Sequence, residues 1–429
     1  MRFDTLPGRC GCARNRSQTV QRRALALTRM QKAAVGSTCA FTVWMLFGSV
    51  QPAAAVNLNE WVPGLKGSVF VTERVEYESN IFGVRNATDD FILKTIPGLS
   101  LDYSRGATSV ALAYSAEVLH FWEHSKQDNT HHIASGSLGY DGPRVRASLS
   151  DAFTRTSDSP NSELTGRVES TTNALTSSLE VKITDRLSLG PNFGWTHVEF
   201  LTVRQLDRNE YLYGGTLFWK FLEKAQIGLG YNHGETDFQK TINFTKTPNR
   251  DVTRDQAVIR LRGDLTSTLQ TGLTAGYEIR HAEAKGQKSV EGYIVGGDVT
   301  YRPAARTTLT LSLNRSYQES TFTGVTNQGL FYTTTSAILS LEQRFGEKLR
   351  GNVRISGTDN DYPTKNATGF HQRFAFREDA IYGWGGGLDY DLMKQLSLGG
   401  EYSHSARYSN FREFKYADDK VIAKITLTF

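Results

Sequence analysis

Charged side chains in this 429-residue chain often occupy every second position, between apolar neighbours. In a β-strand, this spacing places the charges on one face and the apolar residues on the other. Charges of both signs on one face make a hydrated surface that can hydrogen-bond a polar solute. We expect the following residues to line such a surface: Arg74, Glu76, Glu117, Arg146, Arg260, Arg262, Glu278, Arg280, Glu342, Arg350, Arg354 and Glu401.

These charges allow two interpretations. In the first, they form a solvated wall with ion pairs between neighbouring strands. In the second, they form a track of hydrogen-bonding groups that guides a glycan, and Arg260 and Arg262 next to Arg280 make a basic strip suited to an anionic polymer. The spacing alone leaves both interpretations open.

Motifs for catalysis or metal binding are absent from the sequence, which has no Gly-x-Ser-x-Gly, phosphate loop or His-Glu-x-x-His. Four histidines gather around one predicted loop: His120, His124, His131 and His132. A metal site needs ligands that converge on one point with supporting carboxylates, and this spacing does not indicate that. We therefore expect no catalytic residues, no metal site and no cofactor.

Strands must position these charges, and the last ten residues show the strand pattern most clearly. Val421, Ala423, Ile425, Leu427 and Phe429 are apolar at every second position, with mostly polar residues between them. About ten residues with one apolar and one polar face match a strand that crosses a membrane in a barrel. A closed barrel has no unpaired edge, whereas such a strand at the edge of a soluble sheet would need cover.

The same alternation recurs along the chain and predicts an all-β fold, a transmembrane antiparallel β-barrel of about 18 strands with a range of 16–18. The expected strands are 67–81, 91–103, 110–118, 132–140, 144–154, 173–183, 187–198, 209–219, 225–233, 256–265, 269–280, 291–301, 307–317, 331–344, 349–358, 380–390, 396–405 and 420–429.

The links between the expected strands alternate in length. Short links follow even-numbered strands, as at 105–107 and 141–143, whereas longer links follow odd-numbered strands, as at 234–255, 318–330 and 359–379. Outer-membrane barrels have short periplasmic turns and longer external loops. We therefore expect both ends of the barrel to lie on the periplasmic side.

Aromatic residues end many of the even-numbered strands, just before a short link or the chain terminus. Aromatic rings favour the boundary between lipid and water, so these residues predict a girdle at one membrane interface. The expected girdle consists of Tyr103, Tyr140, Trp219, Tyr301, Phe345, Tyr390 and Phe429.

Residues 1–55 indicate a secretory signal peptide, followed by a barrel domain at 56–429. A basic stretch precedes a short apolar run at 39–50 and the small residues Ala53-Ala54-Ala55, and Met30 is an alternative start to Met1. The leader holds eight Lys/Arg and one acid, so its removal lowers the formal net charge from +5 to −2. The mature chain thus has no basic excess for nucleic acid, and no cysteine.

Two segments near the start of the expected barrel resemble a family of outer-membrane β-barrel porins. They are Glu73–Phe82, which contains Tyr-x-Ser-Asn-Ile-Phe, and Ile96–Ser104, which contains Pro-Gly-Leu-x-Leu-x-Tyr, with Asp89-Asp90 between them. The layout of strands is similar over the whole mature chain. The C-terminal Phe429 also resembles the assembly signal of bacterial outer-membrane barrels.

The resemblance implies an outer-membrane pore of a Gram-negative bacterium, not an enzyme, because the family carries no established catalytic residues. Its members are often encoded beside exopolysaccharide biosynthesis genes, which implies an exit route for polysaccharide or a path for carbohydrate diffusion. The implied partners are outer-membrane lipid, the barrel-assembly machinery, and a secreted polysaccharide with its periplasmic export components.

Two alternatives to a pore stay open at this point. One is an outer-membrane lipid hydrolase, in which a Ser or Thr would act beside His197 or His281 near the outer rim. The other is a closed structural or adhesive barrel, in which the expected loop at 234–255 or 359–379 would fold into the lumen.

Overall fold

The computed structural model describes residues 58–158, 166–239, 250–283, 289–320, 331–368 and 373–429. The predicted signal peptide at residues 1–55 lies outside these ranges. A short helix, α3 (Leu58–Trp61), precedes the sheet. The strands are β1 (Leu65–Glu78), β2 (Asp90–Arg105), β3 (Thr108–Phe121), β4 (Asn129–Asp141), β5 (Val145–Thr156), β6 (Ser170–Lys182), β7 (Leu187–Phe200), β8 (Arg208–Lys220), β9 (Ala225–Phe238), β10 (Val252–Asp264), β11 (Leu269–Ala282), β12 (Val290–Ala304), β13 (Thr307–Glu319), β14 (Phe331–Phe345), β15 (Leu349–Thr368), β16 (Arg373–Met393), β17 (Leu396–Ser409) and β18 (Tyr416–Thr428).

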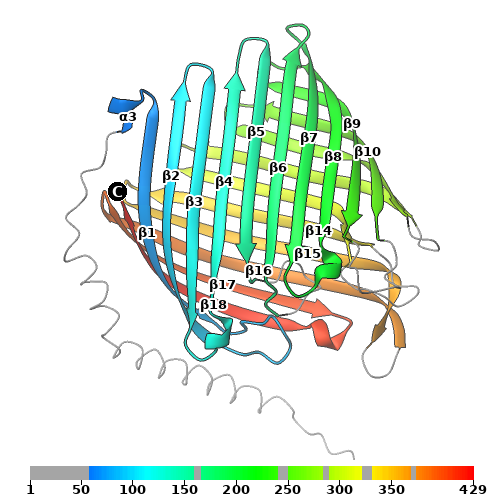
Figure 1. Ribbon diagram of the computed structural model, residues 1–429. Helices are drawn as coiled ribbons and strands as arrows, with labels where there is room; N and C mark the ends of the chain where they lie inside the picture. The colour runs from blue at the N-terminus through cyan, green and yellow to red at the C-terminus, as the bar shows by residue number, and fades with distance from the viewer. Residues whose placement is uncertain (1–57, 159–165, 240–249, 284–288, 321–330, 369–372) are drawn as a thin grey trace, which may run out of the picture. The chain divides into compact units, whose positions relative to one another are not determined.

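Each described strand pairs antiparallel with the next along the chain, and β18 pairs with β1. Figure 1 shows the result: β2 to β10 form the near wall beside β1, and the later strands return behind them until the C-terminus lies beside β1. The described residues therefore form a closed barrel of 18 antiparallel strands, which confirms the predicted fold class. Among these residues, no helix is long and apolar enough to cross a bilayer.

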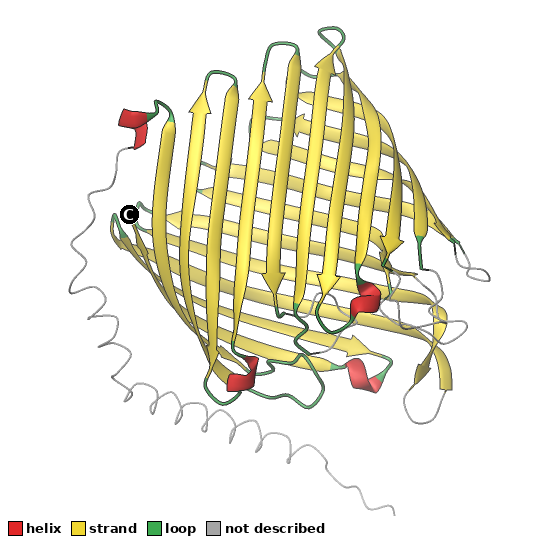
Figure 2. Cartoon of the chain, viewed as in Figure 1, coloured by secondary structure: helices red, strands yellow, loops and turns green. Residues whose placement is uncertain are grey.

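Link lengths alternate around the barrel as predicted. After even-numbered strands the links hold two to four residues, as at 106–107 and 183–186, so these ends form what we call the short-turn end. Links after odd-numbered strands are mostly longer. Three of them carry the short 3-10 helices η1 (Ser125–Gln127), η2 (Arg204–Leu206) and η3 (Arg412–Phe414), which lie at the opposite end of the barrel in Figure 2.

The predicted loop at 359–379 is mostly strand, which corrects the sequence interpretation. β15 and β16 pair as far as Thr368 and Arg373, so only 369–372 lies outside the described residues. The pairing shifts register between Tyr362 and Lys365, where the regular alternation that marks a strand in the sequence is interrupted. At 234–255, β9 and β10 likewise extend into the expected loop, and 240–249 is not described.

Exposure alternates along the strands and separates the two faces of the wall. On β10, Ile259 is 50 % exposed whereas its neighbour Val258 is 4 % exposed. Glu180 of β6 and Arg262 of β10 contact each other at 2.8 Å although β7, β8 and β9 lie between their strands. Such a contact is possible only on the concave side of the sheet, so these charges point into the lumen. Residues of the opposite parity, such as Ile259, point outward.

The predicted girdle residues lie on the outward face at the short-turn end. Tyr140, Trp219, Tyr301, Phe345 and Tyr390 each expose more than two fifths of their surface. Tyr103 pairs with Leu65 at the same end, and Phe429 exchanges backbone hydrogen bonds with Val69. This is the arrangement in which amphipathic rings contact a membrane interface.

The assignment of faces predicts opposite outcomes for two neighbouring substitutions on β13. Leu311 faces outward between Val299 and Leu339, whereas the Ser312 hydroxyl donates to Asp298 on the inward face. Leu311→Arg should lower the free energy of unfolding by about 2–4 kcal/mol because it places a guanidinium in lipid. Ser312→Arg should lower it far less, since that side chain reaches water. Urea unfolding in lipid vesicles measures both, and equal losses would contradict the assignment.

Candidate functional site

All twelve charged residues that the sequence predicts on the polar face occupy inward positions of their strands. They alternate with outward apolar residues such as Val75, Ile259 and Val353, each about half exposed. The lumen wall is therefore charged along much of its height. Several of these charges form local ion pairs, whereas Arg260 contacts only uncharged oxygens.

The first group is a seam cluster, which we define as Arg74, Glu76, Lys94 and Lys420. Glu76 of β1 is fully buried, and its carboxylate contacts Arg74 at 2.9 Å, Lys94 of β2 at 3.0 Å and Lys420 of β18 at 3.1 Å. One carboxylate thus links the first, second and last strands on the inner side. Because three cations surround it, the loss of its charge would leave them facing one another.

Arg280 belongs to a second neutralised group, far from Arg260 and Arg262. Its guanidinium contacts Glu278 at 2.7 Å and Glu319 at 3.0 Å, and the side chain is 3 % exposed. In the antiparallel register, Arg280 pairs with Arg254, whereas Arg260 pairs with Thr274. The predicted strip of three arginines is therefore wrong in this detail, because neighbouring numbers on adjacent antiparallel strands run in opposite directions.

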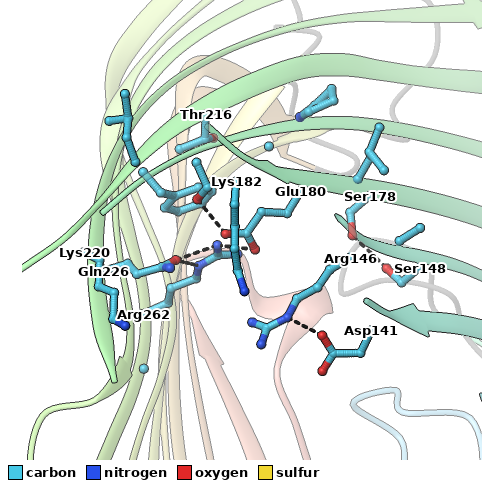
Figure 3. Close-up of a pocket in the computed structure, with 18 of the residues that line it drawn as sticks. Asp141, Arg146, Ser148, Ser178, Glu180, Lys182, Thr216, Lys220, Gln226 and Arg262 are labelled. Atoms are coloured by element: carbon cyan, nitrogen blue, oxygen red, sulfur yellow. Dashed lines mark hydrogen bonds and ion pairs between the residues drawn. The ribbon is translucent and has the colours of Figure 1, made fainter. Parts of the chain in front are cut away.

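Arg260, Arg262 and Arg146 line a cavity of about 1290 Å³ at the short-turn end of the lumen, which we call the lumen pocket. Residues of β3 to β10 and of the short turns beside them form its walls. Figure 3 shows Arg262 of β10 and Glu180 of β6 pointing toward each other in the pocket, with Arg146 directed at Asp141. The pocket also contains uncharged polar groups, such as the hydroxyls of Ser148 and Ser178, 2.7 Å apart.

Arg262 is held by three different kinds of contact. Its Nη2 is 2.8 Å from a Glu180 carboxylate oxygen, and its Nε and Nη2 donate to Gln226 Oε1 at 3.0 and 2.7 Å. The guanidinium carbon lies 3.6 Å from the centre of the Phe218 ring. A cation stacked on an aromatic face and fixed by hydrogen bonds has little rotational freedom left.

Glycines on β9 make this arrangement possible. A Cβ at Gly228 would lie 2.6 Å from atoms of Phe218 and Thr216, and a Cβ at Gly230 would lie 2.6 Å from Arg260 Nη1. With no side chains at these inward positions, the two arginines of β10 reach across β9 to the residues of β8. Arg260 donates to the Thr216 hydroxyl and lies 3.4 Å from Asn232 Oδ1.

The family profile described as "Putative beta-barrel porin 2" matches residues 65–429, from the start of β1 to the end of the chain. The chain belongs to this porin family. It is thus a β-barrel porin, as the sequence predicts. Comparison with curated proteins found no match for the porin.

Comparison with solved structures found similarities of low score. OccK1 (OpdK) of Pseudomonas aeruginosa is 12 % identical, with a TM-score of 0.44 over 85 % of this chain and 99 % of that one. OccK2 (OpdF) of the same organism is 12 % identical, with a TM-score of 0.45 over 85 % and 98 %. OccAB3 of Acinetobacter baumannii is 10 % identical, with a TM-score of 0.40 over 85 % and 99 %.

The histidines of the porin that gather between β3 and β4 do not converge. The rings of His120 and His124 pair with Asp128 and Asp90. His131 contacts Glu117 and Ser157, and His132 contacts Tyr114. Within the described ranges, no three His, Cys, Asp or Glu side chains come together in a way that could hold a metal ion.

The two histidines considered for a lipid hydrolase have unremarkable partners. His197 Nδ1 contacts the amide oxygen of Asn209 at 2.9 Å, not a hydroxyl. His281 Nδ1 lies 3.3 Å from Ser289 Oγ, which is long for a hydrogen bond. Neither contact gives the short nucleophile–base pair that the hydrolase alternative requires.

Sequence reasoning missed two features of the porin. The first is Phe218, the ring beneath Arg262, whose signal is the Gly228-Leu-Gly230 repeat on the neighbouring strand. The second is a hydrogen-bonded group on the outward face, in which a Tyr and a His of one strand donate to an Asp of the next. Tyr231 and His233 donate to Asp255. Tyr402 and His404 donate to Asp419. The Tyr-x-His spacing on one strand is the signal for this repeated contact.

Replacing Glu76 tests the seam cluster. Glu76→Gln should lower the free energy of unfolding by about 3–5 kcal/mol, because it leaves three cations together without their buried counter-charge. Glu401→Gln is the matched control, since Glu401 is an exposed carboxylate on the inward face of β17. Urea unfolding in micelles measures both variants, and similar stabilities for the two would show that Glu76 does not hold the seam.

Replacing Gly228 tests how the arginines are positioned. Gly228→Ala should destabilise the porin by about 1–3 kcal/mol, because the new methyl group overlaps Phe218 and Thr216. Gly272→Ala is the control, since Gly272 is an inward glycine of β11 with no atom within 4 Å of the added Cβ. Its stability should stay within about 0.5 kcal/mol of wild type. The same unfolding assay would refute the close packing if the two variants behaved alike.

Proposed function

We propose that the porin is a pore for carbohydrate in the outer membrane and that it serves the export of an exopolysaccharide. The observation that carries this proposal is the wall of the lumen, which is lined by charged and hydroxyl-bearing side chains. A barrel of this strand number is wide enough to enclose water. The hydrated wall carries positive and negative side chains, which offer hydrogen-bond donors and acceptors. Such a wall suits a solute that is covered with hydroxyl groups.

The position of the lumen pocket supports a role in passage rather than in surface adhesion. The pocket lies at the short-turn end, which faces the periplasm in barrels of this type. A polymer that leaves the cell would meet this end first, and periplasmic export components would dock there. At its wall it would find Ser148, Ser178 and Asn192, whose side chains can exchange hydrogen bonds with sugar hydroxyls.

Single-channel recording in planar bilayers tests the pore with a matched pair of variants. Ser178 lines the pocket and contacts Ser148, whereas the preceding Ser177 pairs with Phe193 on the outward face. We expect the wild-type porin to conduct, Ser178→Trp to conduct measurably less, and Ser177→Trp to conduct like wild type. A barrel that stays closed under every condition would refute the pore and favour a structural or adhesive role.

The export role needs a separate experiment in a polysaccharide-secreting host. Deletion of the gene should lower secreted polymer and raise the amount retained in the periplasm. The Ser177→Trp variant should restore secretion, because it changes only the outward face. Normal secretion in the deletion strain would contradict the export role. It would still be compatible with a pore through which small carbohydrates diffuse.

A further inference from the structure

Positive charge accumulates in the lumen pocket. Seven basic residues line it: Arg146, Lys182, Arg186, Lys220, Lys224, Arg260 and Arg262. Four acidic residues line it: Asp141, Glu180, Asp185 and Glu223. Two of the acids are engaged, because Asp141 pairs with Arg146 at 2.6 Å and Glu180 pairs with Arg262 at 2.8 Å. The basic excess is therefore carried by groups with no carboxylate partner within hydrogen-bonding distance.

Several charges elsewhere in the described lumen are paired. Lys424 contacts Asp389 at 2.9 Å, Arg350 contacts Asp391 at 2.9 Å, and the buried Arg377 pairs with Asp379. The seam cluster contains three cations around Glu76, and Lys420 also contacts Glu78 at 3.3 Å. At the lumen pocket, by contrast, seven basic residues face four acidic ones.

Arg260 has no carboxylate among its described contacts. It is partly buried, and its contacts in the structure are the uncharged oxygens of Thr216 and Asn232. Its nearest charged neighbour along β10 on the same face is another arginine, Arg262. Partial burial of a cation beside a like charge is unfavourable unless an anion compensates it.

The two guanidinium groups are also oriented before any ligand arrives. Phe218 and Gln226 fix Arg262, and Thr216 fixes Arg260, in each case without neutralising the charge. Arginine binds carboxylate and other oxyanions through paired N–H groups in a fixed plane. Because the side chains are already ordered, an anion that binds them loses less free energy to ordering the site.

We propose that the lumen pocket binds an acidic saccharide and that Arg260 and Arg262 hold its carboxylate. This inference rests on the proposed pore function and adds the substrate class. A volume of about 1290 Å³ exceeds that of an ordinary small-molecule site, so the pocket accommodates several linked sugar units. Ser148, Ser178 and Ser188 provide hydroxyls for the sugar. Lys182 and Lys220 raise the local concentration of the anionic chain.

Glu180 acts as the internal competitor for this site. It accepts from Ser188 Oγ at 2.6 Å and contacts Arg262 at 2.8 Å, so it occupies one guanidinium when the pocket is empty. An incoming carboxylate binds Arg260 first and then displaces Glu180 from Arg262. Such a competitor weakens the binding of the solute, which suits a transport pathway because the solute must also leave.

Titration calorimetry on the full, detergent-solubilised porin tests the proposal directly. The ligand is trigalacturonate, and its methyl-esterified form is the matched control of the same size without the carboxylates. We expect trigalacturonate to bind, its affinity to fall as salt is added, and the ester to bind at least about tenfold more weakly. Equal binding of the two ligands, or none by trigalacturonate, would overturn the proposal.

Two double variants separate the site from the general charge of the barrel end. Arg260→Gln with Arg262→Gln should weaken trigalacturonate binding at least about tenfold. Arg302→Gln with Arg344→Gln removes two exposed cations from the same end, outside the pocket, and should change affinity by less than about twofold. Equal effects of the two pairs would overturn the proposal. Heat-modifiable migration on a gel reports whether each variant is folded. If the variant with Arg260→Gln and Arg262→Gln does not fold, the comparison of trigalacturonate with its methyl ester on the wild-type porin tests the proposal instead.

Two further outcomes are informative. Inorganic phosphate that binds as tightly as trigalacturonate, and displaces it, would overturn the saccharide assignment in favour of a small-anion site. Conductance is recorded on the same preparation, so the two proposals fail separately. If the barrel conducts but binds trigalacturonate and its methyl ester equally, only the acidic-saccharide site is refuted. If the barrel stays closed, the pore is refuted whatever the calorimetry shows.

Discussion

The pairing of β1 with β18 is the interaction on which the rest of the structure depends. A backbone N–H or C=O that faces lipid cannot bond to water, so a sheet with a free edge is not viable in the hydrocarbon region. The register between Phe70 and Thr428, continued to Glu78 and Lys420, removes both edges at once. Closure creates an enclosed side, and only this enclosure gives the polar face of each strand a lumen to line. On the inner surface, the seam cluster adds ion pairs between β1, β2 and β18.

Closure also lets side chains meet that no pairing of adjacent strands brings together. Arg262 and Glu180 come from β10 and β6, and they meet because the wall curves around them. At Gly228 and Gly230 the inner wall has no side chains, so the arginines of β10 lie across β9 and rest on β8. The glycines of β9 thus allow the arginine side chains of β10 to extend toward β8. That arrangement makes the lumen pocket an ordered site and not simply a charged stretch of wall.

Most of the architecture could be predicted from the sequence because it follows from local stereochemistry. Residues two apart on a strand share a face, so the alternation of Val421 to Phe429, and of its counterparts upstream, predicts strands and their orientation. Link lengths predict which ends are short turns. The prediction was wrong at 359–379, where strand pairing continues through residues whose apolar pattern is interrupted, as at the register shift beside Tyr362. There, hydrogen bonds between the two backbones hold the hairpin, and those leave little trace in side-chain periodicity.

The sequence by itself determined which residues face inward, because that depends only on parity along one strand. Only the tertiary structure decided which inward residues act together. Arg280 is close in number to Arg262 but pairs with Arg254 and is neutralised by Glu278 and Glu319, whereas Arg260 remains without a carboxylate. Register, curvature and the packing of Phe218 against glycine set these partnerships. They depend on the positions of several strands at once, and no pattern within a single strand contains that information.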